Sequence, residues 1–464
     1  MKKFIEPESV ALIGVSRTLM SIGRASIDVL PNLISYGYEG KIYPIHPQAS
    51  EIQGLKAYAA IAEVPGNIDL AVIDLPRDLV PGMLRQCVDK GIKAVIIITQ
   101  GFSDANDGRG KQLQKEIDDA RRGTSTRILG PNTLGTANAY IKFSSGFMET
   151  QMEEIPVGFV CQSGVFFLGP DGLKLMGKGI DLGNSSDINI SDGVEYFGQD
   201  TGTKVIGLHI EGTQDSRRFL EVANRVAHKK PVVALKTGKN EWAAQAAQAH
   251  TSSLVGKGEI WDAALKQAGV IRVDDVEELG DTIRTFYTLP LMKGRRVGIV
   301  TYTGGFGVMG IDACQKSGLE VARFSPATIN RLSALCPSWQ RVSNPIDVAP
   351  MLVVTRKASF IEAPEIATKT LFADPEVDAV LCIVGAVDPS LGIGLRQLAE
   401  EVAISYPDKP LVFYFYGPFS TEVKHDLEAK GKTLSFSSPD RAIRALGHLA
   451  DYAEFRAVIP PKPS

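Results

Sequence analysis

The sequence predicts an α/β protein whose parallel sheets are covered by helices. Short apolar runs alternate with helix-length amphipathic segments along all 464 residues, which is typical of βαβ units. In addition, the second and third parts of the chain repeat one plan, and each has the pattern of a small flavodoxin-like unit. A chain of this length suggests roughly three domains.

The first domain is expected to span residues 1–150. Its strands are expected where apolar runs precede turn residues, at 9–13, 41–45, 70–75 and 94–99. Gly14 ends the first of these strands, and a helix is expected near residues 23–35. The polar stretch 149–156 marks the boundary to the second domain.

The second and third domains are expected to span residues 151–290 and 291–464. Four pairs of strands correspond: 157–160 with 297–300, 204–208 with 378–382, 230–233 with 409–412, and 270–271 with 434–435. The two copies differ in length at one place. From Gly238 to Val270 there are 32 positions, and from Gly417 to Thr433 there are 16. Extra length on a repeated scaffold often has a function, although a neutral surface insertion would give the same difference.

The extra segment contains His250. It follows an Ala-rich stretch, 242–249, and precedes small residues that include Gly256 and Gly258. Small neighbours would let a phosphate or a second chain come close. A lone histidine in an exposed loop usually has no such role, so the interpretation depends on other residues.

Two features near the expected carboxyl ends of strands could assist a reactive histidine. Gln162, Ser163 and Gly164 follow the strand 157–160, and a helix starting near Gly164 would offer free N–H groups to a phosphate. A serine nucleophile is the alternative, but the GxSxG pattern is missing. Glu211 follows the strand 204–208; its carboxylate could orient a histidine ring, or simply precede the next helix as a capping acid.

The first domain contains a second candidate site. The turn at Gly14, Ser16 and Arg17 follows a strand and precedes a helix, an arrangement that binds phosphate groups. The GxGxxG spacing is absent, which disfavours a dinucleotide but leaves a ligand with several phosphates. Thr99 and Gln100 follow another strand at the same expected edge, although ordinary turn chemistry would also explain them.

The composition excludes other classes. With 44% hydrophobic and 22% charged residues and a net charge of −3, the chain gives no reason to expect nucleic acid or an anionic membrane as a partner. No apolar stretch reaches membrane-spanning length. The five cysteines are scattered without a CxxC pair, which suits a reducing cytoplasm, and no metal-ligand spacing occurs.

The motifs in their order resemble the α subunit of the ADP-forming acyl-CoA synthetases, which are relatives of succinyl-CoA synthetase. The most specific stretches are 41–47, 130–132, 162–164, 236–256, 267–271 and 344–347. The resemblance covers essentially the whole chain. It implies an N-terminal Rossmann-like CoA-binding domain followed by two flavodoxin-like ligase domains of the succinyl-CoA synthetase type.

The resemblance also implies a reaction. Acid, CoA and ATP would interconvert with acyl-CoA, ADP and phosphate through an acyl phosphate and a phosphohistidine at His250, with Glu211 as the orienting acid. Gln162, Ser163 and Gly164 would hold the phosphate. The implied CoA-binding residues are Gly14, Ser16, Arg17, Thr18, Leu19, Ile98, Thr99, Gln100 and Asn132. ATP, ADP and Mg²⁺ are expected on a separate ATP-grasp β subunit, in a heteromer such as α2β2.

The chain departs from the family pattern after Gly164. Pro170, with Gly169 and Gly172, should shorten or break the helix that the family has there, and Phe166 and Phe167 add bulk at the mouth of the implied acyl site. The run 182–187 also lacks a lysine common in the family. A CoA-binding regulatory module without turnover is therefore an alternative, and a Rossmann-type oxidoreductase is a weaker one.

Overall fold

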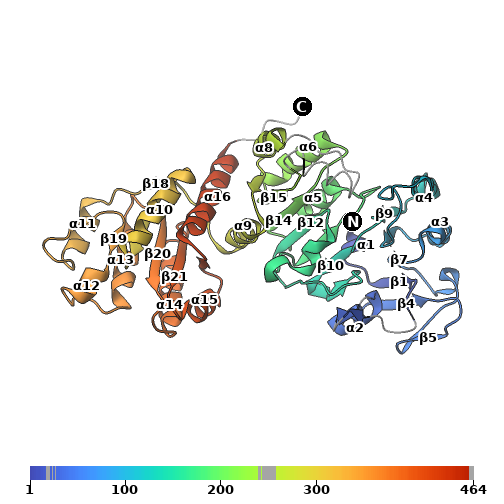
Figure 1. The fold of residues 1–464 in the computed structure, drawn as a ribbon, viewed down its shortest axis with the longest axis horizontal. Coiled ribbons are helices and arrows are strands. Elements are labelled where there is room, and N and C mark those ends of the chain that lie inside the picture. The colour runs from blue at the N-terminus through green and yellow to red at the C-terminus, as the bar shows by residue number, and fades with distance from the viewer. Residues whose placement is uncertain (17–20, 23–24, 27, 239–241, 243–257, 459–464) are drawn as a thin grey trace. The chain divides into compact units, whose positions relative to one another are not determined.

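The computed structural model describes residues 1–464 except 17–20, 23–24, 27, 239–241, 243–257 and 459–464. The chain divides into two compact units, Met1–Ile283 and Arg284–Ser464. Three sheets of five, seven and six strands form their framework (Figure 1). The predicted α/β class is confirmed.

The first sheet has five parallel strands in the order β4, β1, β7, β8, β9. Their bounds are β1 Ser9–Ile13, β4 Lys41–Ile45, β7 Leu70–Ile73, β8 Ala94–Ile97 and β9 Arg127–Leu129. The first two coincide with the expected strands, and β7 and β8 end two residues earlier than expected. Every residue of β1, β7 and β8 is buried, as in parallel sheets that helices cover on both faces.

The first long helix of this unit begins later than the sequence predicts. α2 spans Val29–Tyr36 instead of 23–35. Its start is set by Asp28, whose side chain accepts a hydrogen bond of 3.3 Å from the amide of Leu30 at the helix N-terminus. The short paired strands β2 (Ser21–Ile22) and β3 (Ala25–Ser26) precede it.

The second sheet has the order β11, β10, β13, β12, β14, β15, β16. The bounds are β10 Thr136–Asn138, β11 Phe143–Ser144, β12 Val157–Cys161, β13 Lys178–Asp181, β14 Val205–Ile210, β15 Val232–Lys236 and β16 Ile271–Val273. β10 and β11 are antiparallel and come from residues 136–144, before the boundary expected at 149–156. This sheet therefore does not follow that boundary, and the division into 1–150, 151–290 and 291–464 stays a prediction.

The third sheet belongs to the second unit and separates two apolar cores. Its strands are β17 Arg296–Thr301, β18 Glu320–Val321, β19 Ile346–Asp347, β20 Ala379–Gly385, β21 Leu411–Tyr416 and β22 Leu434–Phe436. Along β20, alternate residues face opposite sides, as a strand requires: Cys382 packs into one core and Leu381 into the other. α13 (Glu362–Ala373) and α14 (Leu391–Ser405) pack on one side, and α10 (Gly304–Lys316) and α16 (Pro439–Ala457) on the other.

The second and third sheets share one plan, as the sequence repeat predicts. The strand orders β13-β12-β14-β15-β16 and β18-β17-β20-β21-β22 both follow the flavodoxin-like sequence 2-1-3-4-5. A lysine repeats with them. Lys230, before β15, donates hydrogen bonds of 2.8 and 2.6 Å to two carbonyls at the end of α5 (Ile190–Gln199). Lys409, before β21, donates bonds of 2.9 and 2.8 Å to two carbonyls at the end of α13.

Shorter elements complete the described chain. The other α-helices are α1 Lys2–Ile5, α3 Val80–Asp89, α4 Gly108–Arg121, α6 Ser216–Ala227, α8 Gly258–Gln267, α9 Val276–Thr288, α11 Pro326–Ser333, α12 Ala349–Val353 and α15 Ser420–Glu428. The 3-10 helices are η1 Ile61–Glu63, η2 Arg77–Leu79, η3 Ala139–Ile141, η4 Gly164–Leu168 and η5 Pro170–Gly172, and β5 (Glu51–Ile52) pairs with β6 (Leu55–Lys56). None of the helices that the structure describes is long and apolar enough to cross a membrane.

Candidate functional site

The turn at Gly14 lies at the carboxyl edge of the first sheet. Gly14 follows β1 directly and has φ of 96°, a conformation that favours glycine. A Cβ atom at this position would lie 1.8 Å from the carbonyl oxygen of Asp74, which follows β7. The glycine lets the two strand ends approach closely and leaves the backbone open to a ligand at this edge.

Hydrogen bonds join the neighbouring strand ends and bring three expected CoA-binding positions to one edge. The Thr99 hydroxyl donates a bond of 2.7 Å to the carbonyl of Leu75, and the Asn132 amide donates one of 3.0 Å to the carbonyl of Thr99. The Asp74 amide donates a bond of 2.9 Å to the carbonyl of Ile13, beside Gly14. Gly14, Thr99 and Asn132 therefore follow strands that end side by side.

The remaining residues expected at this edge differ in exposure. Ile98 is buried, while Gln100 is exposed. The Ser16 amide donates a hydrogen bond of 3.3 Å to the carboxylate of Asp28, a residue that the sequence reasoning missed. Partial burial raises the pKa of Asp28, although the amide bonds that it accepts oppose the rise. Three further expected residues lie outside the described residues: Arg17, Thr18 and Leu19.

In the second sheet, the structure brings Gln162 and Glu211 together. The side-chain oxygen of Gln162, directly after β12, accepts hydrogen bonds from the amides of Glu211 at 2.7 Å and Gly212 at 3.1 Å, directly after β14. Both side chains are buried, at 9% and 8% exposure. The two candidate residues thus lie at adjacent carboxyl ends of parallel strands, where ligands bind in sheets of this kind.

Lys236 supports the same strand end and was not predicted. It ends β15, is 1% exposed, and donates a hydrogen bond of 2.9 Å to the carbonyl of Glu211. Its Nζ lies 5.4 Å from the ring centroid of Trp261 in α8, within cation–π range. The signal in the sequence was a lysine at the end of an otherwise apolar strand.

The predicted interruption of the helix after Gly164 is confirmed. η4 ends at Leu168, Gly169 adopts a left-handed conformation with φ of 69°, and η5 follows. Five residues of 3-10 helix give only a small helix dipole, so a phosphate at Ser163 and Gly164 would depend on local N–H groups. Phe166 and Phe167 are buried, so their bulk is packed into the core.

His209, on β14, has a core environment. It is 3% exposed, and its Nε2 lies 3.1 Å from the hydroxyl oxygen of Thr237. Burial, and to a smaller extent the charge of Lys236, lower the pKa of His209 to about 3. The imidazole is therefore neutral near neutral pH. His250 lies outside the described residues, which resume with α8 after that segment.

Asp181 is a buried carboxylate next to the candidate phosphate-binding turn, and sequence reasoning missed it. It ends β13 beside Cys161 of β12 and is 2% exposed. Its Oδ2 accepts a hydrogen bond of 2.7 Å from the Leu134 amide. The Thr133 hydroxyl lies 2.5 Å from the Asp181 carbonyl oxygen and 3.1 Å from Oδ2. Burial raises its pKa to about 6 although these bonds oppose the rise.

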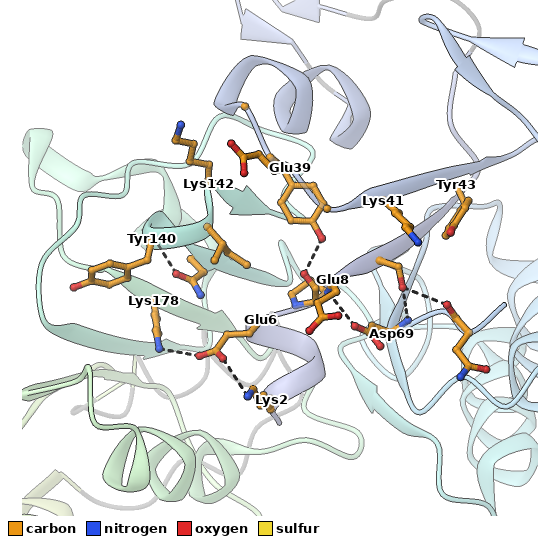
Figure 2. A pocket seen from close by; sticks show the side chains of 18 of the residues that line it. Lys2, Glu6, Glu8, Glu39, Lys41, Tyr43, Asp69, Tyr140, Lys142 and Lys178 are labelled. Carbon is orange, nitrogen blue, oxygen red and sulfur yellow. Dashed lines mark hydrogen bonds and ion pairs between the residues drawn. The ribbon is translucent and has the colours of Figure 1, made fainter. Parts of the chain in front are cut away.

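A separate cavity of about 1070 Å³ lies at the amino ends of β1, β4 and β7, away from the candidate residues (Figure 2). Charged side chains line it, and several of them pair with one another. Lys178 lies 3.0 Å from Glu6, and Lys2 lies 3.9 Å from the same carboxylate. Because ligands of parallel sheets bind at the carboxyl ends of the strands, this cavity is not the expected site. Within the described residues, no cluster of His, Cys, Asp or Glu side chains could hold a metal ion.

Comparisons with known families identify two regions. A CoA binding domain matches residues 8–139, and a succinyl-CoA ligase like flavodoxin domain matches residues 155–286. The first region contains the edge at Gly14, and the second contains Gln162 and Glu211.

Individual proteins are similar over nearly the whole chain. The α subunit of ADP-forming acetate–CoA ligase II from Pyrococcus furiosus is 34% identical over 460 residues, 97% of each chain. An ADP-forming acetate–CoA ligase from Methanocaldococcus jannaschii is 35% identical over 458 residues, which are 98% of this chain but 63% of that protein. The solved structure of a dinucleotide-forming acetyl-coenzyme A synthetase 1 from Ca. Korarchaeum cryptofilum, in complex with phosphate and ADP, has a TM-score of 0.85 and 28% identity, covering 98% of this chain and 97% of that one.

Proposed function

The chain belongs to the α subunits of the ADP-forming acid–CoA ligases, and we propose on this basis that it interconverts acid, CoA and ATP with acyl-CoA, ADP and phosphate by way of a phosphohistidine at His250. The observation that carries the proposal is the 34% identity over 97% of both this chain and the α subunit of an ADP-forming acetate–CoA ligase. An identity spread over the complete length favours a ligase subunit over a regulatory module without turnover.

The proposed synthesis direction has three transfers. The γ-phosphoryl group of ATP moves to a ring nitrogen of His250, and ADP leaves. A carboxylate oxygen of the acid then attacks the phosphorus, the P–N bond breaks, and an acyl phosphate forms. Finally the CoA thiolate attacks the acyl carbon, the C–O bond to the phosphate breaks, and inorganic phosphate leaves. Covalent transfer through a side chain replaces one difficult step by easier ones.

The described residues support this assignment at two places. Glu211 and Gln162 lie at adjacent strand ends, joined by the bonds from Gln162 to the 211–212 backbone, and Lys236 holds the carbonyl of Glu211. We assign the phosphate to Gln162, Ser163 and Gly164 and the orienting role to Glu211. At the other edge, Gly14 lets the ends of β1 and β7 lie close together, because a Cβ there would meet the Asp74 backbone, and Gly14 itself is exposed. We assign CoA to this edge.

The larger CoA contact set is assigned by position. It comprises Gly14, Ser16, Arg17, Thr18, Leu19, Ile98, Thr99, Gln100 and Asn132, of which the structure describes all but residues 17–19. All six described members follow strand ends of one parallel sheet within three residues. Backbone N–H groups at such ends are suited to phosphate groups.

A partner subunit completes the proposed enzyme. This chain spans 97% of a relative named an α subunit but 63% of a longer relative, and we propose that the remaining third of the longer relative corresponds to a second protein. We propose that this partner is an ATP-grasp β subunit that binds ATP, ADP and Mg²⁺, in a heteromer such as α2β2.

Labelling tests the relay. The chain and its β partner are incubated with γ-labelled ATP, or the chain is incubated with labelled phosphate and an acyl-CoA. Acid-labile, base-stable label is expected on the wild type and on His425→Ala, which changes an exposed histidine of the second unit, but not on His250→Ala. Label that persists in His250→Ala contradicts the residue assignment. Its absence from the wild type, in the presence of an active partner, contradicts the relay.

A further inference from the structure

We propose that Asp181 is a positioning residue that fixes the spacing between the CoA-binding edge of the first sheet and the phosphate-binding turn of the second. The inference rests on the proposed function, since it concerns the step in which an acyl group passes between the two sites. All the residues involved belong to the compact unit Met1–Ile283.

The carboxylate of Asp181 holds the segment that follows the first sheet. Besides the bond to Oδ2 from the Leu134 amide, the Asp181 carbonyl accepts a bond of 2.5 Å from the Thr133 hydroxyl, and the Asp181 amide donates one of 2.8 Å to the carbonyl of Gly135. Residues 133–135 are therefore fixed to the end of β13 by both the side chain and the backbone of one residue.

The same carboxylate lies against the phosphate-binding turn. Asp181 pairs with Cys161, three residues before Gly164. A Cβ atom on Gly164 would lie 3.4 Å from Oδ2 of Asp181 and 2.8 Å from Cδ1 of Leu134. The turn thus packs directly on the Asp181 carboxylate and on Leu134. A shift of residues 133–134 would therefore displace the turn.

A continuous path of hydrogen bonds and adjacent residues leads from Asp181 to the CoA-binding edge. Asn132, next to Thr133, donates its amide to Thr99, one of the expected CoA contacts. The loop after Asp181 reinforces this path, because Asn184 donates its amide at 2.9 Å to Pro131 and its side chain at 2.6 Å to Asp104. A few hydrogen bonds therefore connect the two sites, so a displacement at one of them would move the other.

Only an acceptor on both side-chain oxygens suits this place. The hydrogen-bond donors to the carboxylate are the amides of Leu134 and Gly183 and the Cys161 thiol at 3.8 Å. An asparagine would keep the volume but direct an NH₂ group at one of these donors. One buried hydrogen bond would be lost and the 133–134 segment would shift.

The test compares three variants of the full chain with its β partner. Asp181→Asn replaces one acceptor oxygen by an NH₂ donor. Thr133→Val removes the hydroxyl that contacts Asp181. Asp374→Asn is the matched control: Asp374 belongs to the second unit, is 1% exposed, and accepts the amides of Ser325 and Glu376, each at 2.9 Å. The measurements are CoA affinity by calorimetry, labelling by γ-labelled ATP, and kcat for acyl-CoA formation.

For Asp181→Asn, kcat should fall about 100-fold, the loss that a displacement near 1 Å can cause, while CoA affinity and labelling stay within about twofold of wild type. Thr133→Val should show the same split with a smaller loss, and Asp374→Asn should keep kcat. Wild-type kcat in Asp181→Asn, or a parallel fall in affinity and labelling, would overturn the inference. If Asp181→Asn does not fold, the same criteria apply to Thr133→Val. A wild type that neither binds CoA nor takes up label contradicts the proposed function. A wild type that does both, together with an Asp181→Asn variant of unchanged kcat, contradicts this inference alone.

Discussion

The ring of Phe166 stacks on the imidazole of His209, with centroids 4.4 Å apart and ring planes inclined by 29°. Phe159 lies on β12, and its ring centroid is 5.6 Å from that of Phe166. The stack connects the shortened segment after Gly164 to the strand that leads to Glu211. Burial of these rings makes the altered segment part of the core of the second sheet.

Replacement of Phe166 should therefore be costly. Phe166→Ala removes a ring that is 4% exposed, and we expect the free energy of unfolding to fall by about 3–5 kcal/mol. The neighbouring Val165 is 50% exposed, so Val165→Ala should change it by less than about 0.5 kcal/mol. Denaturant unfolding of both variants measures the difference. Equal effects at the two positions would show that the stack does not stabilise the fold.

The lowered pKa of His209 makes stability depend on pH. With a pKa of about 3 in the folded state and about 6.5 when unfolded, the unfolded chain binds the proton first as the pH falls. The stabilising contribution is present above pH 6.5 and is lost progressively toward pH 3. Between pH 7 and 5, this loss amounts to about 2 kcal/mol.

His209→Phe should remove that loss. The variant keeps an aromatic ring against Phe166 but cannot titrate. Unfolding curves at pH 7 and pH 5 should show that the variant loses about 2 kcal/mol less than the wild type on acidification. Identical losses in both proteins would contradict the burial of a neutral histidine at this position.

The sequence predicted the sheets better than the connections between them. β1 and β4 match the expected residues because continuous apolar runs flanked by turn residues are a local signal. The start of α2 was missed because Asp28 and the short pair β2–β3 replace the expected first turns. Glu211 and Gln162 were found at strand ends, whereas the contact of Asp181 with residues 133–134 depends on pairing across some 47 positions, which no local pattern encodes.

Gly14 offers a test of the first edge. Gly14→Ala combines an unfavourable φ of 96° with a Cβ that meets the Asp74 carbonyl at 1.8 Å, so the turn must move. We expect a loss of CoA binding in calorimetry and a drop in unfolding free energy well above the cost of φ alone, which is about 1–2 kcal/mol.

Gly66→Ala is the matched control for that change. Gly66 also has a positive φ, 77°, but a Cβ there would meet no atom within 4 Å. This variant should show only the cost of φ, about 1–2 kcal/mol, and bind CoA as the wild type does. Normal CoA binding by Gly14→Ala would contradict the assignment of this turn.

Asp181 should give a pH dependence opposite to that of His209. Burial raises its pKa to about 6, above the ordinary 3.8, so the folded state binds the proton first as the pH falls. The stabilising contribution is full below pH 3.8 and is lost as the pH rises through 6. The Cys161 thiol beside it stays neutral because burial raises its pKa. Asp181→Asn should therefore lose about 1 kcal/mol more stability than the wild type between pH 7 and 5, whereas His209→Phe loses less. Unfolding curves of the two variants and the wild type at both pH values separate these effects, and an equal loss in Asp181→Asn and the wild type would show that Asp181 is ionised in the folded protein down to pH 5.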